Sequence, residues 1–141
     1  MAYLFDTDAI SELLRPRPLP AYVRWLDGIP RDEQYTSAVT VGELFKGAYR
    51  SGAVERHLAN IEERVLPAVT ALPYDVATAR VFGQLRADLE GRGEPLPDAD
   101  VQIAAIALHH DLELVTGNQR HFRRIPGLRL NPVLSEARLR G

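Results

Sequence analysis

Short strand-like runs alternate with longer helix-like segments along this chain, and this alternation constrains its fold more than any other feature. Apolar or β-branched runs predict strands at 2–5, 34–38, 69–72, 112–116 and 128–131. Helical periodicity marks segments at about 8–14, 19–27, 54–66, 75–90 and 99–110, and a further helix opens near Thr40. Such alternation is typical of a parallel sheet with helices on both faces. We therefore expect an α/β fold of three layers around a central, mainly parallel sheet of four to five strands.

The length and composition of the chain suit one globular domain spanning residues 1–141. The absence of cysteine excludes disulfides, thiolate zinc sites and cysteine nucleophiles. A formal net charge of −2 gives no bulk attraction for nucleic acid. No apolar run reaches the roughly 20 residues that span a bilayer, and Asp6 and Asp8 interrupt the apolar start that a secretory signal needs. We expect a cytoplasmic protein that makes no membrane contact.

Acidic and amide side chains fall where the predicted strands end. Asp6 directly follows the first strand, Glu43 lies in the first turn of the helix after the second, and Asn118 follows the strand that ends at Thr116. Asp98 and Asp100 lie at the entry to helix 99–110. The carboxyl ends of parallel strands meet at one edge of a sheet, so these side chains are predicted to converge. Converging carboxylates repel one another unless a cation neutralises them, and Mg²⁺ prefers oxygen ligands.

Each of these residues also has a purely local interpretation. Thr7 or Asp8 is a candidate N-cap for the helix at 8–14, and Asp98 for the helix at 99–110. Glu43 has the spacing of a capping box with Thr40. Asp100 is a first-turn carboxylate that the helix dipole favours, and Asn118 is a common turn residue. Only their joint placement at strand ends favours a site.

Four stretches, in order, cover nearly the whole chain and carry a family resemblance: LFDTDAISELLRP, TSAVTVGELFKGA, LPDADVQIAAIALHHDLELVTGNQRHF and IPGLRLNP. The sequence resembles PIN-domain proteins, and among them the VapC toxins of bacterial toxin–antitoxin pairs, including the FitB-like members. The resemblance implies a single PIN domain over residues 1–141.

The resemblance also implies roles for individual residues. It makes Asp6, Glu43 and Asp100 the core metal ligands and, with Asn118, the catalytic set, while Thr7 and Thr116 support the site. Asp8 and Asp98 remain further candidate ligands. Two positions depart from the family pattern, because Asp8 stands where an Asn is usual and Asn118 where an Asp is frequent.

The implied activity is endonucleolytic cleavage of RNA that depends on Mg²⁺ or Mn²⁺ and leaves a 3′ hydroxyl. The implied partners are a second copy of the chain, the RNA substrate and a cognate VapB-like antitoxin that inserts a segment near the active site. Basic residues at the site edge are candidates for phosphate contacts: Arg15, Lys46, Arg120 and Arg123.

Two alternatives stay open at this point. Strand-Asp-x-Asp at residues 6–8 also opens haloacid dehalogenase-like phosphatases, in which Asp6 would be the nucleophile. That chemistry needs a lysine late in the chain, whereas the only lysine is Lys46. The other alternative is a PIN-like module that binds RNA or antitoxin without cutting, which the departure at Asn118 leaves possible.

Overall fold

A five-stranded sheet forms the centre of the computed structural model, which describes residues 1–140. The strands lie in the order β3-β2-β1-β4-β5, and every neighbouring pair is parallel. The strand bounds are β1 Tyr3–Phe5, β2 Gln34–Ser37, β3 Thr70–Leu72, β4 Glu113–Val115 and β5 Leu130–Asn131. The predicted α/β class and its parallel sheet are confirmed.

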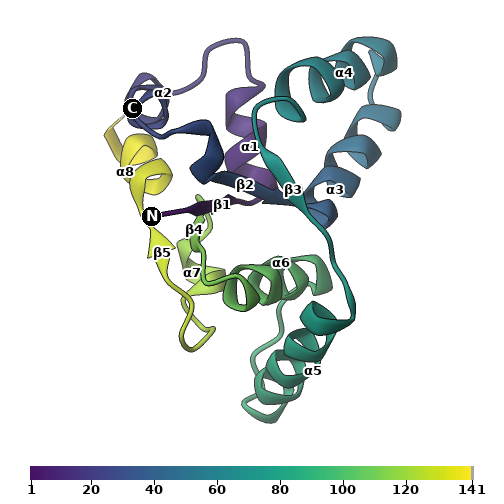
Figure 1. Ribbon diagram of the computed structural model, residues 1–141, viewed down its shortest axis with the longest axis vertical. Helices are drawn as coiled ribbons and strands as arrows, with labels where there is room; N and C mark the ends of the chain where they lie inside the picture. The colour runs from purple at the N-terminus through teal and green to yellow at the C-terminus, as the bar shows by residue number, and fades with distance from the viewer. Residues whose placement is uncertain (141) are drawn as a thin grey trace.

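Helices cover both faces of this sheet, as Figure 1 shows. One layer contains α1 (Thr7–Leu13), α2 (Pro20–Asp27), α3 (Ala38–Tyr49), α4 (Val54–Asn60) and α8 (Val133–Arg140). The other contains α5 (Val76–Gly91), α6 (Asp98–His109) and α7 (Gln119–Phe122). A 3₁₀ turn at Arg31–Glu33 precedes β2, and a π-helical turn at Ile61–Val65 continues α4.

The two hydrophobic cores follow from the alternation of side chains along the central strands. Leu4 and Leu114 are fully buried in the core with α5 and α6, whereas their neighbours Phe5 and Val115 are buried in the core with α1, α3 and α8. Successive strand residues point to opposite faces, so two adjacent apolar residues per strand anchor both helical layers. Helix α6 is buried along most of its length because it packs between the sheet and α5.

Some helix boundaries differ from the sequence prediction. The helix expected to open at Thr40 begins at Ala38, because the Ser37 hydroxyl caps it by accepting from the Thr40 amide (2.9 Å). Helices α7 and α8 were not predicted, since they are short and polar. Within residues 1–140, no helix combines the length and apolar character needed to cross a membrane.

The strand order creates a crevice at the carboxyl end of β1. The chain moves outward from β1 to β2 and β3, then crosses back through α5 and α6 to pair β4 with the other side of β1. Phe5 lies level with Thr36 of β2 and Val115 of β4. Ligands of parallel α/β sheets bind where connections diverge in this way. Asp6, the residue that follows β1, therefore lies at the position that the topology opens.

Candidate active site

A hollow of about 540 Å³ opens at this end of the sheet, and acidic side chains from three separate segments line it. Asp6 and Asp8 come from the β1–α1 junction, Glu43 from α3 and Asp100 from the first turn of α6. The remaining lining residues are Thr7, Ser11, Ile103, Gly117, Asn118, Phe122 and Arg138. The predicted convergence of Asp6, Glu43, Asp100 and Asn118 on one space is thus what the fold produces.

Asp6 is the most buried of these carboxylates, with 4% of its surface exposed. It is the N-cap of α1, since its Oδ1 accepts from the Ala9 amide at 2.8 Å. The assignment of this cap to Thr7 or Asp8 was wrong, because both already lie inside the helix. The pKa of Asp6 is raised from 3.8 to about 7, mainly because burial disfavours its charged form. Hydrogen bonds from the Thr116 hydroxyl and the Ala9 amide lower this pKa, and the charges of Asp8 and Asp100 raise it.

Asp100 is half-buried and shares the Nδ1 atom of His121 with Asn118. His121 Nδ1 lies 3.3 Å from Asp100 Oδ2 and 2.8 Å from Asn118 Nδ2. Burial raises the pKa of Asp100, the imidazole of His121 lowers it, and the charge of Glu43 raises it again. The backbone N–H of Asn118 also donates to the Thr116 hydroxyl at 2.9 Å. These contacts link the ends of β4 and α7 to the first turn of α6.

Glu43 is held by Thr7 rather than by its own helix terminus. The Thr7 hydroxyl donates to Glu43 Oε1 at 2.5 Å and lies 3.3 Å from the Thr40 hydroxyl. The capping-box interpretation of Thr40 and Glu43 was wrong, since Ser37 is the N-cap and both residues lie within α3. Glu43 therefore faces α1 across the hollow, where its carboxylate makes no contribution to the helix cap.

The remaining two acidic candidates are each paired with an arginine. Asp8 makes a two-pronged ion pair with Arg138 of α8, at 2.7 and 2.9 Å. Asp98 lies outside the hollow, 76% exposed, and accepts from Arg86 at 2.6 Å. Its assignment as an N-cap was wrong, because Pro97 occupies that position and no side chain caps α6. The proline precedes the helix and leaves Asp98 in the first turn, directed towards α5.

The donor set of the hollow fits a hard divalent cation. Asp6, Glu43 and Asp100 offer carboxylate oxygens, which Mg²⁺ and Mn²⁺ prefer over nitrogen or sulfur. The pKa values of Asp6 and Asp100 are both raised, mainly by burial and further by neighbouring carboxylates, so a bound cation would favour their charged forms. Within residues 1–140, no three Asp, Glu or His side chains already converge on a common point. Ligation therefore requires rotation of the Glu43 and Asp100 side chains, which are only partly buried.

A family model described as the PIN domain matches residues 3–128. The chain belongs to the PIN-domain family. It is 36% identical over 129 residues to the tRNA(fMet)-specific endonuclease VapC of Shigella flexneri, covering 92% of this chain and 96% of that protein. It is 36% identical over 124 residues to the toxin FitB of Neisseria gonorrhoeae, covering 84% and 89%.

The fold of this PIN domain also matches solved VapBC complexes. In the crystal structure of DNA-bound VapBC from Salmonella typhimurium, the matching chain has a TM-score of 0.83 and 32% identity, with 93% of this chain and 97% of that chain covered. These likenesses place the chain among the VapC-type ribonucleases of the family. The phosphatase alternative is not supported, because Lys46 is exposed on α3 and does not line the hollow.

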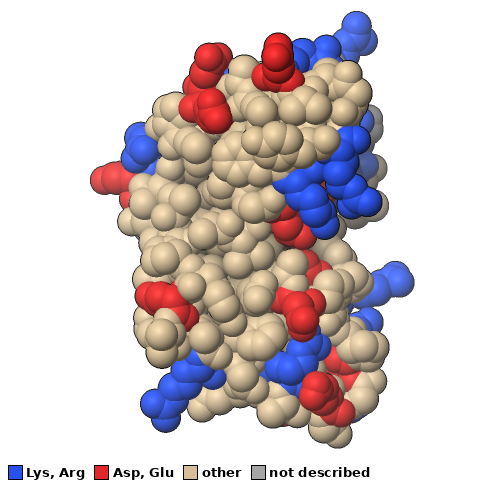
Figure 2. Space-filling model, turned by 90° about the vertical axis from the view of Figure 1, so that its right-hand side faces the viewer, with Lys and Arg blue, Asp and Glu red and all other residues tan. Residues whose placement is uncertain are grey.

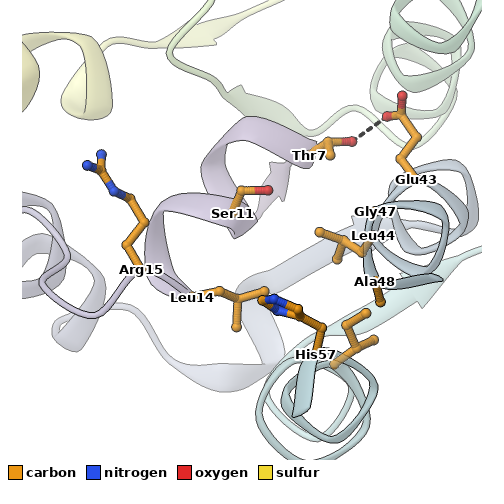
Figure 3. A pocket seen from close by; sticks show the side chains of 10 residues that line it. Thr7, Ser11, Leu14, Arg15, Glu43, Leu44, Gly47, Ala48 and His57 are labelled. Atoms are coloured by element: carbon orange, nitrogen blue, oxygen red, sulfur yellow. Dashed lines mark hydrogen bonds between the residues drawn. The ribbon is translucent and has the colours of Figure 1, made fainter. Parts of the chain in front are cut away.

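A second groove adjoins the carboxylate hollow of the PIN domain, between α1, α3 and α4 (Figure 3). It shares Thr7, Ser11 and Glu43 with the hollow, so a ligand in the groove would reach the acidic side chains. Leu14, Leu44 and Ala48 contribute apolar lining. Of the predicted phosphate-binding residues, Arg15 lines this groove, whereas Lys46, Arg120 and Arg123 are exposed and line neither space.

Sequence reasoning missed two residues at this site. His121 was not among the predicted site residues, although its position three residues after Asn118 on α7 brings it to Asp100. Arg138 was missed because α8 was not predicted and because its partner Asp8 lies 130 residues earlier. The spacing to Asn118 was a usable signal for His121, whereas nothing local in the sequence indicated Arg138.

Proposed function

We propose that this PIN domain is a divalent-cation-dependent endoribonuclease that acts as the toxin of a toxin–antitoxin pair. The observation that carries the proposal is the convergence of Asp6, Glu43 and Asp100 from three elements on one hollow, in a chain related over nearly its full length to a VapC endonuclease. We infer that these three carboxylates hold Mg²⁺ or Mn²⁺. When bound, the cation supplies a more acidic water and positive charge beside the scissile phosphate.

The surrounding residues orient the three carboxylates for this chemistry. The Ala9 amide holds Oδ1 of Asp6, and the Thr116 hydroxyl also hydrogen-bonds this carboxylate. Thr7 fixes Glu43 through a hydrogen bond, and His121 lies against Asp100. Asn118 contributes an amide side chain at the same edge, and we infer that its oxygen orients the attacking water. Asp6 is thus held at the strand end, whereas Glu43 and Asp100 would exchange these contacts for the cation when it binds.

Cleavage of a defined RNA tests this proposal. A tRNA(fMet) transcript is the first substrate to try, because one relative is specific for it, and other structured RNAs serve as comparisons. We expect cleavage with Mg²⁺ or Mn²⁺, products with 3′ hydroxyl ends, and no cleavage with EDTA or in the Asp6→Asn variant. Cleavage that persists in EDTA would refute cation dependence. RNA binding without turnover would instead support the non-catalytic module.

We further propose that a cognate VapB-like antitoxin inhibits the enzyme by occupying the groove between α1, α3 and α4. The groove has a volume of about 300 Å³ and mainly apolar lining, which suits apolar side chains of a bound peptide. Because Glu43 lines both spaces, a bound segment would lie beside the carboxylates. The protein encoded next to this gene, co-purified and tested for inhibition of RNA cleavage, provides the check.

A homodimer is the remaining expected partner. Figure 2 shows one face of the molecule, in which an uncharged area covers the left and centre-left, while charged side chains gather at the top and along the right half. This side carries α3, α5 and the edge strand β3 (Figure 1). Helices α3 and α5 each contribute one exposed large apolar residue, Tyr49 and Val76 respectively. Light scattering after size exclusion tests the dimer. Because the proposed substrate is cytoplasmic RNA, we place the protein in the cytoplasm.

A further inference from the structure

The active-site hollow contains one basic side chain, and it comes from the last helix of the described chain. Arg138 of α8 lines the same space as Asp6, Glu43 and Asp100, and it is the only Lys or Arg among the lining residues. It lies ten residues beyond the segment that the PIN-domain model matches, which ends at residue 128. We propose that Arg138 binds a phosphate of the RNA substrate at the hollow and that Asp8 is its positioning partner.

The guanidinium of Arg138 is held in one orientation. Nη1 donates to Asp8 Oδ2 at 2.7 Å and Nη2 donates to Asp8 Oδ1 at 2.9 Å, so the planar fork is fixed by two parallel bonds. Nη2 also donates to Glu12, whose side chain is fully buried, at 3.4 Å. Within residues 1–140 these three contacts leave Nε–H and one Nη1–H for another acceptor. The side chain is 37% exposed, so an acceptor from solution reaches it.

The guanidinium of Arg138 lies close against the backbone of Gly117, which has no side chain to obstruct it. A Cβ on Gly117 would clash with Arg138 Nη1 and with Asp8 Oδ2. Any residue other than glycine would therefore force the Arg138 and Asp8 side chains to shift. Gly117 immediately follows Thr116 and precedes Asn118, so the ion pair is built directly against the strand end that carries the site.

Electrostatics explain why a phosphate would need this group. RNA carries a negative charge at each phosphate, and four carboxylates line the hollow. A cation among Asp6, Glu43 and Asp100 neutralises part of that charge, and Arg138 offsets Asp8 while keeping two N–H donors available. Arginine is suited to this role, because it stays charged and its fork matches phosphate oxygens. The carboxylate at position 8, where the family usually has an amide, therefore orients the arginine; we do not assign it to the cation.

This inference rests on the proposed ribonuclease function, and RNA binding without cleavage separates the two. The Kd of labelled tRNA(fMet) transcript is measured in EDTA for the wild type and for Arg138→Ala, over a range of salt concentrations. We expect Arg138→Ala to weaken binding about tenfold at physiological salt and to reduce the salt slope by about one. With Mg²⁺ present, kcat/KM should fall by at least the same factor.

Arg140 provides a matched control on the same helix. Its side chain is 74% exposed, lies 3.9 Å from Glu136 and does not line the hollow. Arg140→Ala removes the same charge and should leave the Kd within about twofold and the salt slope unchanged. Asp8→Asn should keep or tighten RNA binding, because Arg138 loses the carboxylate that neutralises it. The same variant should lower kcat, because the guanidinium of Arg138 is no longer held in one orientation.

Loss of the ion pair also removes a contact that holds α8 against α1, so the folding of each variant is checked by thermal unfolding. If Arg138→Ala does not fold, Arg138→Gln replaces it, since glutamine still donates to Asp8 but carries no charge. Equal Kd and salt slope for the Arg138 and Arg140 variants would overturn the inference and leave the ribonuclease proposal intact. A folded wild-type protein that neither binds nor cleaves RNA would overturn both.

Discussion

Asp6→Asn should stabilise the fold while removing its activity. Asparagine caps helices about as well as aspartate, so the bond from the Ala9 amide to the side chain is retained. The substitution removes a buried negative charge that lies beside two further carboxylates. The charged carboxylate of Asp6 is thus predicted to lower the stability of the metal-free wild type, as functional groups often do.

The magnitude follows from the pKa of Asp6, which rises from 3.8 to about 7 on folding. Because the pKa of Asp6 is higher in the folded state, its carboxyl costs no stability below pH 3.8, where it is protonated in both states. The free energy of unfolding then falls as pH rises, and the loss is complete above about pH 7. Three pKa units correspond to about 4 kcal/mol above pH 7, whereas at pH 5 the loss is about 1.5 kcal/mol. At about 3 °C per kcal/mol, Asp6→Asn should melt roughly 10 °C higher than the wild type at pH 8.

Thermal unfolding in EDTA at pH 5 and pH 8, followed by circular dichroism, measures this difference. Addition of Mg²⁺ should raise the Tm of the wild type at pH 8, by about 2.7 kcal/mol of stability at 100 times its Kd, and should leave Asp6→Asn unchanged. Asp6→Ala serves as the comparison, because it also removes the cap and forfeits about 1 kcal/mol of the gain. The reasoning is refuted if Asp6→Asn melts below the wild type at pH 8, or if its advantage does not shrink at pH 5.

Three further predictions concern the hollow and the groove. Glu43→Gln should reduce kcat at least a hundredfold with a Tm within about 2 °C of the wild type, because Ser37 caps the helix; retained activity would contradict the assignment of Glu43 to the cation. Asp100→Asn should abolish cleavage, whereas the exposed Asp98→Asn, measured in the same cleavage assay, should change kcat less than twofold and stability by at most about 1 kcal/mol. Gly47 of α3 lines the groove, and a side chain there would project into open space. In Gly47→Trp, RNA cleavage should therefore persist while antitoxin affinity, measured by calorimetry, falls at least tenfold; unchanged affinity would exclude the groove.

Local sequence was sufficient for the sheet and for the polar residues that follow its strands. Each strand was predicted to within about two residues, because strands at the centre of a parallel sheet are short apolar runs that differ from the helices around them. Asp6 and Asn118 could be placed from the strand ends alone. Asp100 could be preferred to Asp98 only through the family resemblance, since both lie in the first turn of α6 and differ in the direction they face.

The tertiary structure decided which polar group each acidic side chain meets. Ser37, rather than Thr40, is the N-cap of α3, because this helix begins two residues earlier than the sequence indicated. Asp8 meets Arg138 across 130 residues of sequence, and Asp100 meets His121 across 21. The sequence by itself determined the parallel α/β sheet and the acidic residues at its edge, since both depend on local pattern. The partners of those residues depend on how α7 and α8 pack against the sheet, which only the folded chain defines.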